Sequence, residues 1–107
     1  MKKIFLLAAL ACTGAQAEFI TGNELLARLN ASDQYDRGVG MGYVMGVFDA
    51  TYQITHCPPA GVTAGQVRDM IVKTLNTGAE VRHMAADGFI TFTLKTAWPC
   101  AKKGSGI

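Results

Sequence analysis

The sequence predicts an all-α fold: a small four-helix domain over residues 18–100, closed by one disulfide and preceded by a cleaved signal peptide. Three observations support this prediction. Thr21 and Thr63 each stand before apolar residues at helical spacing, where threonine caps a helix. Pro58 and Pro99 follow the second and fourth predicted helices and would end them. The start of the chain has the pattern of an export signal.

Residues 1–17 match a secretory signal peptide, with a basic start, an apolar run and a small-x-small cleavage site, in the order MKKIFLLAALACTGAQA. Cleavage between Ala17 and Glu18 would leave residues 18–107 in the periplasm. An uncleaved N-terminal membrane anchor is the alternative, which the shortness of the apolar run disfavours.

The first predicted helix of the domain runs from Gly22 to about Asn30. Thr21 can cap its N-terminus, and Glu24 stands at the reciprocal position of a capping box. Its apolar face consists of Leu25, Leu26 and Leu29.

The second predicted helix begins near Asp33 and runs to about Thr55. Its centre has small residues at steps of four, which places them on one helical face. We call them the small-residue ridge: Gly38, Gly42, Gly46 and Ala50. Val44 and Phe48 lie roughly on the opposite side. The uncharged run here is well short of the ~20 residues that cross a bilayer.

Each glycine inside a helix costs roughly 1 kcal/mol against alanine, so we expect a closely packed helix to offset the cost of the ridge. The neighbour is either the last helix of the same chain, with its small Ala85, Ala86 and Gly88, or the same ridge of a second molecule. We favour the contact within one chain, because a bridge between Cys57 and Cys100 would align the ends of the two helices.

The third predicted helix follows Thr63, which with Gln66 forms a T-x-x-Q capping box, and ends near Gly78. The last predicted helix covers Glu80–Trp98. Its segment GFITFTL alternates like a strand, but a single strand would have no partner in this chain. We expect residues 101–107 to form a disordered tail.

Two cysteines, Cys57 and Cys100, remain once Cys12 leaves with the signal peptide. In an exported protein they favour one disulfide, which would contribute roughly 4 kcal/mol to stability. Two free thiols and a bridge between chains stay as alternatives. A lipoprotein anchored at Cys12 is a further alternative, although Ala9 and Leu10 are not the residues usual before a lipidated cysteine.

The charge balance excludes two classes of partner. The formal net charge of +2 comes from Lys2 and Lys3, so the chain without its signal peptide is neutral. A neutral chain with interspersed charges and no basic stripe gives no basis for binding nucleic acid or an anionic membrane. A domain of this size has a marginal core, which a disulfide or dimerisation would support.

No catalytic motif is present, and we expect neither an enzyme nor a bound cofactor. The candidate acids and bases, Asp49, Asp87, His56 and His83, form no recognisable pattern. We expect Asp49 to be a buried structural carboxylate. The two histidines have no metal-ligand spacing, so we expect no metal site and interpret both as surface or capping residues.

Four segments together resemble one known family: FITGNELL, GYVMGVFDA, CPPAGVTAGQVRDMIVKTL and WPC. They are similar to the Rap/Tai-type immunity proteins associated with type VI secretion amidase effectors, and the match covers Phe19 to Cys100. The resemblance implies a periplasmic, all-helical, usually dimeric protein that binds and blocks a peptidoglycan-cleaving amidase. Members often carry another cysteine pair, at the positions of Leu29 and Gly40, which this chain lacks.

An inhibitor of this kind would present an exposed loop to its enzyme, and two loops are candidates, residues 58–61 and 76–82. We favour the second loop, which offers polar groups for partner binding: Asn76, Thr77, Glu80 and Arg82. Other functions stay open, namely a small periplasmic helical stress chaperone or an accessory binding protein of unknown partner.

Overall fold

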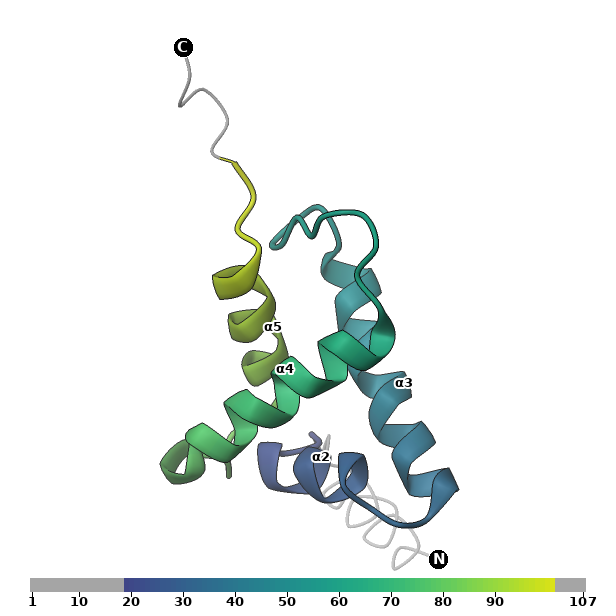
Figure 1. The fold of residues 1–107 in the computed structure, drawn as a ribbon. Coiled ribbons are helices and arrows are strands. Elements are labelled where there is room, and N and C mark those ends of the chain that lie inside the picture. Colours follow the sequence, from purple (N-terminus) through teal and green to yellow (C-terminus); the bar gives the residue numbers. More distant parts are fainter. Residues whose placement is uncertain (1–18, 102–107) are drawn as a thin grey trace, which may run out of the picture.

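A computed structural model describes residues 19–101 as four α-helices and a short 3₁₀ turn (Figure 1). The elements are α2 (Gly22–Leu29), α3 (Gln34–Thr51), α4 (Ala64–Thr77), η1 (Ala79–Val81) and α5 (Ala86–Ala97). The described residues form no strand, only two isolated bridges, so the prediction of an all-α domain with four helices is confirmed. The predicted signal peptide and nearly all of the predicted tail lie outside the described residues.

Side-chain caps start three of the helices. The Thr21 hydroxyl accepts a hydrogen bond from the Glu24 amide, and the Glu24 carboxylate accepts from the Thr21 amide, which completes the predicted capping box. Asp33 caps α3 through the Asp36 amide, and Thr63 caps α4 through the Gln66 amide. These caps explain why the starts of α2, α3 and α4 are readable from the sequence.

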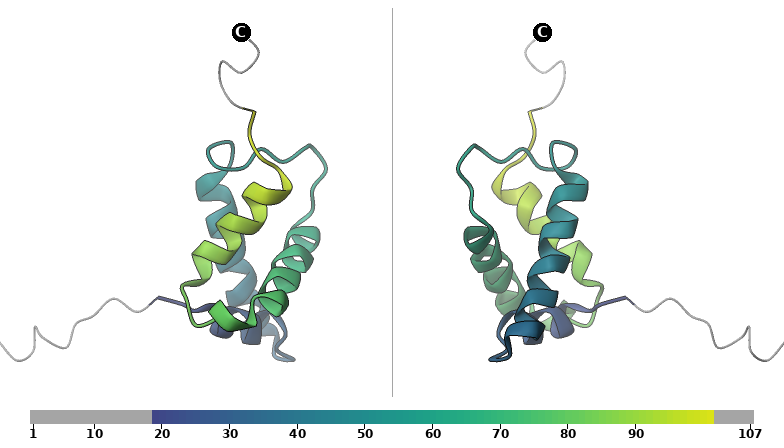
Figure 2. Two further views of the ribbon diagram at one scale, coloured as in Figure 1. Left: turned by 90° about the vertical axis from the view of Figure 1, so that its left-hand side faces the viewer. Right: turned by 90° about the vertical axis from the view of Figure 1, so that its right-hand side faces the viewer.

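The helices pack around one core. Figures 1 and 2 show α3 and α5 side by side, both running toward the same end of the molecule, while α4 crosses them and α2 lies beneath. All four helices contribute fully buried side chains, and these fill the space between them: Leu25, Leu29, Val44, Val67, Ile71, Leu75, Ala86, Ile90 and Leu94. Within the described part of the chain, no helix is both long and apolar enough to cross a membrane.

The N-terminal end of the domain is fastened to the start of α5. The Ala86 amide donates to the Ile20 carbonyl at 2.8 Å, and the Gly22 amide donates to the Met84 carbonyl at 2.9 Å. The Asn23 amide donates to the Arg82 carbonyl at 2.8 Å. The first turn of α2 is therefore tied to the segment that precedes α5.

These long-range bonds explain a predicted boundary that was wrong. The last helix begins at Ala86, not near Glu80. Between η1 and α5, the carbonyl oxygens of Arg82 and Met84 accept hydrogen bonds from amides of α2. These oxygens therefore do not form the hydrogen bonds of a continuous helix. A tertiary contact here overrides a continuous helical pattern.

The end of α3 was also predicted too far along the chain. The helix ends at Thr51 instead of Thr55, because Tyr52 has ψ 130° and Gln53 has φ 60°, both outside the helical region. Residues 52–56 form a compact turn, closed by a hydrogen bond from the Gln53 amide to the His56 carbonyl at 2.8 Å.

The small-residue ridge does not pack against α5, so the favoured prediction of a contact within one chain was wrong. A Cβ placed on Gly38, Gly42 or Gly46 would meet no atom within 4 Å, and Ala50 is exposed. Helix α3 contacts α5 through other faces, since Val44, opposite the ridge, is the residue buried in the core. The ridge faces away from the other described residues.

The close approach of a helix is found at a different glycine. A Cβ on Gly40 would lie 3.1 Å from Leu29 Cδ2 and 3.2 Å from Arg28 Cβ, so α2 and α3 meet at this position. Leu29 and Gly40 are the two positions at which the resemblance implies a further cysteine pair. In this chain a leucine packed on a glycine occupies that place.

Candidate functional site

A groove lies where the end of α4, η1 and the start of α5 meet, at the lower left of Figure 1. Its volume is about 640 Å³, and its walls include Thr77 and Glu80 from the predicted partner-binding loop. Three of its apolar side chains are exposed: Val81 (38%), Met84 (56%) and Phe92 (65%). An apolar surface open to solvent is typical of a site that binds another protein.

Three of the four predicted partner-binding residues lie exposed at this end of the molecule: Asn76, Thr77 and Glu80. The Thr77 hydroxyl donates to the Lys73 carbonyl at 2.8 Å, within its own helix. The Glu80 carboxylate forms no ion pair or side-chain hydrogen bond with any residue between 19 and 101, which leaves it able to pair with a partner.

Arg82, the fourth predicted residue, is occupied inside the fold. Its guanidinium donates to the Leu75 carbonyl at the end of α4 and to Asn23 Oδ1 on α2, both at 3.1 Å. Together with its carbonyl bond to the Asn23 amide, these contacts join α2, α4 and η1. Arg82 therefore holds the groove in shape, while Glu80 faces solvent.

The other candidate loop, residues 58–61, lies at the opposite end of the molecule, beside the ends of α3 and α5 (Figure 1). Its exposed residues include Pro59 and Ala60, and Gly61 has φ 92°, a conformation that favours glycine. Residues 58–61 therefore do not belong to the groove, whose walls include residues of the 76–82 loop.

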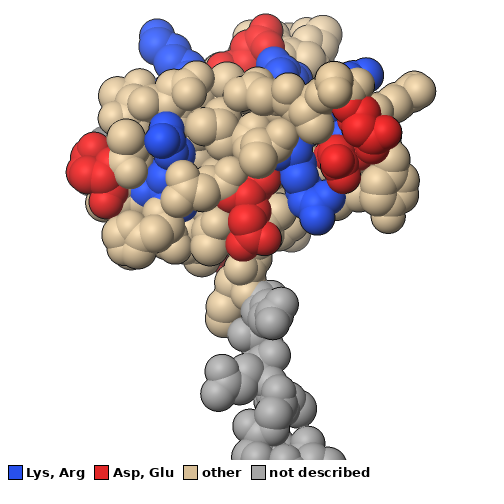
Figure 3. Space-filling model, turned by 90° about the horizontal axis from the view of Figure 1, so that it is seen from below, with Lys and Arg blue, Asp and Glu red and all other residues tan. Residues whose placement is uncertain are grey.

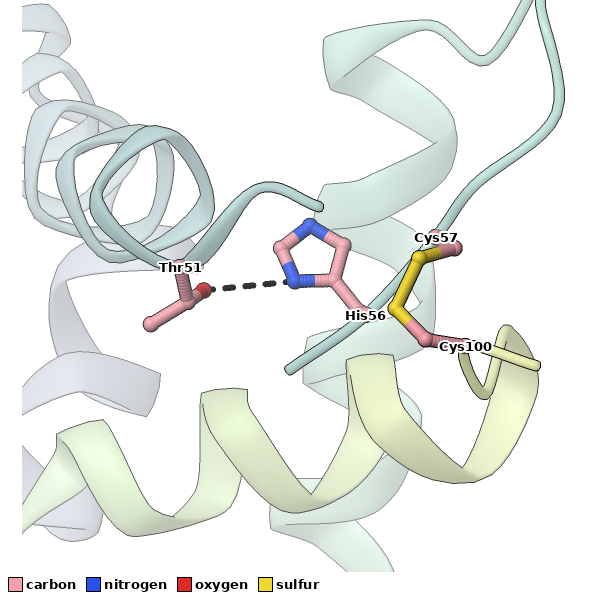
Figure 4. Close-up of a disulfide and its surroundings, with 4 residues drawn as sticks. All are labelled: Thr51, His56, Cys57 and Cys100. Atoms are coloured by element: carbon pink, nitrogen blue, oxygen red, sulfur yellow. Dashed lines mark hydrogen bonds between the residues drawn. A yellow bond between two sulfur atoms is a disulfide. The ribbon is translucent and has the colours of Figure 1, made fainter. Parts of the chain in front are cut away.

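The predicted disulfide joins Cys57 to Cys100 within the chain, with their Cα atoms 4.8 Å apart (Figure 4). The Cys57 amide also donates to the Trp98 carbonyl at 2.8 Å. The bridge therefore connects the chain just after the residue 52–56 turn to the chain just after α5.

His56, the residue before the disulfide, is fully buried, so its prediction as a surface or capping residue was wrong. Its ring centroid lies 4.7 Å from that of Phe48, and its Nδ1 lies 3.2 Å from Thr51 Oγ1 (Figure 4). Burial lowers the pKa of the imidazole from its usual 6.5. His83 is exposed, as predicted.

Asp49 differs from its prediction in the opposite sense. Its side chain is exposed on α3, and it is not a buried structural carboxylate.

Tyr43, on the same helix, lies near Asp87 at the start of α5. Burial, and then the Asp87 carboxylate, raise the pKa of the Tyr43 hydroxyl above 10, and a hydrogen bond with the Asp87 backbone partly opposes them.

Comparison with protein-family models matches residues 21–100 to the Rap1a immunity proteins. The chain belongs to the Rap1a immunity family. The resemblance to Rap/Tai-type immunity proteins is thereby confirmed over most of the chain. A search among curated proteins finds no match. Membership makes this chain an immunity protein directed against a secreted effector, with a protein as its binding partner.

The surface of this Rap1a protein suits a partner recognised by shape and by individual charges. Figure 3 shows basic and acidic side chains interspersed among uncharged ones, without one large patch of either sign on that face. Among residues 19–101, no three histidine, cysteine or acidic side chains gather where they could hold a metal ion.

The exposed apolar residues of the groove were missed in the sequence. Phe92 belongs to the GFITFTL segment, where Ile90 and Leu94 face the core and Phe92, between them, faces solvent. Only the start of α5 at Ala86 shows which of these residues point outward. Phe92, a large aromatic residue that does not lie on the core face of this Rap1a helix, was the signal that could have indicated a binding surface.

Proposed function

We propose that this protein is a periplasmic immunity protein that binds and neutralises a peptidoglycan amidase effector of type VI secretion. The match of residues 21–100 to the Rap1a family is the observation that carries the proposal. The signal-like residues 1–17 support export, and the Cys57–Cys100 disulfide suits an oxidising compartment. Immunity proteins act by binding, which agrees with the lack of a catalytic motif in the sequence.

We place the effector contact at the groove between α4 and α5, with Asn76, Thr77 and Glu80 at its polar edge. An interface needs apolar contacts at its centre and polar groups at its rim. The groove offers Met84 and Phe92 for the first and Glu80 for the second. This arrangement keeps the predicted loop as the binding surface and gives Arg82 a supporting role.

A hydrolysis assay tests the function directly. An amidase encoded beside the gene for this protein would be incubated with peptidoglycan, with and without an equimolar amount of the purified immunity protein. We expect the release of peptide fragments to stop when the immunity protein is present. Full amidase activity at saturating immunity protein would contradict the proposal for that enzyme.

Two variants then test the surface. Glu80→Ala and Phe92→Ala should each weaken inhibition, and Asp69→Ala should not, because Asp69 is an exposed carboxylate of α4 outside the groove, paired only with Arg68. Inhibition that is equally strong in all three variants would exclude the groove without excluding the immunity function.

We also propose that two molecules associate through the small-residue ridge, the alternative that the sequence left open. The ridge is open to solvent, and glycines at 4-residue steps allow two helices to approach closely. Sedimentation of Gly42→Leu tests this dimer. A folded monomer in place of a dimer is expected, whereas an unchanged dimer would place the interface elsewhere.

A further inference from the structure

His56 is a buried titratable group that takes no part in the proposed binding of an effector. Its side chain is completely inaccessible to solvent, and it packs on the rings of Phe48 and Tyr52, whose centroids lie 4.7 and 6.1 Å away. The ring fastens the turn of residues 52–56, which we call the His56 turn, to the end of α3.

The hydrogen bonds around Thr51 determine which imidazole nitrogen carries the proton. The Thr51 hydroxyl has one hydrogen, and it donates this hydrogen to the Val47 carbonyl at 2.8 Å. Toward His56 the same oxygen can only accept, so His56 Nδ1 is the N–H group of the neutral ring. Nε2 is then the unprotonated nitrogen, and it is buried with no hydrogen-bond partner among the described residues.

A second proton would therefore have to bind at Nε2, where no described residue accepts a hydrogen bond from it. The new N–H group would have no acceptor within hydrogen-bond distance among the described residues, and its charge would be buried. Within residues 19–101, Tyr52 is the titratable side chain in aromatic contact with the ring. No charged residue of the packed helices forms an ion pair with the ring: Asp49 on α3 and Lys95 on α5 are exposed, and on α4 Lys73 is exposed while Arg68 pairs with Asp69.

The contacts of the turn indicate what protonation would release. Gln53 adopts φ 60°, which an L-residue with a side chain rarely does, and the turn relies on its bond to the His56 carbonyl and on the buried ring. On the far side of the ring, the disulfide and the bond from the Cys57 amide to Trp98 hold the chain to α5. The disulfide keeps the Cys57 end of the turn beside α5. The Gln53 end is held only by noncovalent contacts, so it is the end that can open.

We propose that His56 is an acid-sensitive latch: when Nε2 takes up a proton, the His56 turn detaches from Phe48 while the helical core stays folded. Opening exposes the Phe48 ring and the end of α3 next to the 58–61 loop. The latch works without an effector, so its test is independent of the immunity function.

Nuclear magnetic resonance of the two histidines tests the first half of the proposal on the unmodified protein. The chain has one other histidine, the exposed His83, so only two rings need to be assigned. We expect neutral His56 to carry its proton on Nδ1 and to titrate below the usual imidazole value of 6.5. A proton on Nε2, or titration of His56 at or above 6.5, would overturn the latch.

Amide hydrogen exchange tests the second half. As His56 becomes protonated, the Gln53 amide, which donates to the His56 carbonyl, should lose protection, while the Ile71 amide in the core keeps it. The His56→Gln variant should lose this step and the matched His83→Gln variant should keep it. Simultaneous loss of protection at Gln53 and Ile71, or an unchanged step in His56→Gln, would contradict local opening.

Discussion

At the scale of single residues, the structure separates Glu80 from Arg82, two charged neighbours that look alike in the sequence. Glu80 has no ion-pair partner in the described chain, whereas the Arg82 guanidinium bonds to Leu75 and Asn23. The Arg82 guanidinium bonds to oxygens of two other elements, so its main effect is on the stability of the fold. The Glu80 carboxylate lies in solvent and is free to bind a partner.

Substitution of Arg82 by alanine should therefore reduce the free energy of unfolding by about 1–3 kcal/mol, because it leaves the Leu75 carbonyl without its side-chain donor and α2 without its brace to η1. Glu80→Ala should change it by less than about 0.5 kcal/mol, as for other exposed side chains. Urea denaturation followed by circular dichroism measures both. Equal effects of the two variants would show that Arg82 is not structural.

His56 gives stability a pH dependence of known sign. Its pKa is lowered in the folded protein and lies near 6.5 in the unfolded chain, so the unfolded chain binds more protons between the two values. The free energy of unfolding should thus fall as the pH decreases below about 6.5. Denaturation curves at a series of pH values check this slope. In His56→Gln the slope over this window should be smaller, and in His83→Gln it should be retained.

Residue burial was the property least readable from the sequence. His56 was expected at the surface and is buried, and Asp49 was expected inside and is exposed. Asp49 is exposed because it lies beside the small-residue ridge, which faces away from the other described residues. The burial of His56 depends on where α3 ends: once the chain turns back at Gln53, the His56 ring returns onto Phe48. No local pattern specifies that return, because it follows from a left-handed residue and a disulfide to the far end of the chain.

At the scale of elements, two glycines of α3 that differ little in sequence context have opposite surroundings. Gly40 touches α2 through Leu29, while Gly42 has open space above it. Gly40→Leu should overpack this contact and destabilise the protein by about 1–3 kcal/mol. Gly42→Leu should not destabilise the isolated chain and should gain up to about 1 kcal/mol of helix propensity. Thermal unfolding of both variants, with Gly42→Leu examined as a monomer, decides between these expectations.

The start of a helix was predicted well where a side chain caps it. Thr21, Asp33 and Thr63 carry the starts of three helices in their own side chains, so local chemistry was sufficient. The start of α5 has no such cap, since Ala85 makes no side-chain hydrogen bond, and it depends on pairing with residues 20–22. Long-range pairing of this kind leaves no periodic signal, which is why the last helix was predicted to begin too early.

At the scale of the whole molecule, the disulfide is the bond that keeps the ends of α3 and α5 together. Replacing both Cys57 and Cys100 by alanine should lower the free energy of unfolding by about 2–5 kcal/mol, because the unfolded chain regains the freedom that the bridge removes. Removing both avoids a free thiol that could pair with another molecule. Guanidinium denaturation of the variant gives the value, and a loss well under 1 kcal/mol would mean that the helices alone hold this end.

The same disulfide turns residues 57–100 into a covalent ring that contains α4, η1 and α5. The exposed 58–61 loop and the polar rim of the groove both belong to this ring. A protease that cuts the backbone once anywhere within it produces no separate fragment, since the two new ends stay joined through sulfur. A single nick should therefore leave one band on a non-reducing gel and give two after reduction. In a compartment with proteases, this protein can therefore remain one molecule after a cut in its exposed 58–61 loop.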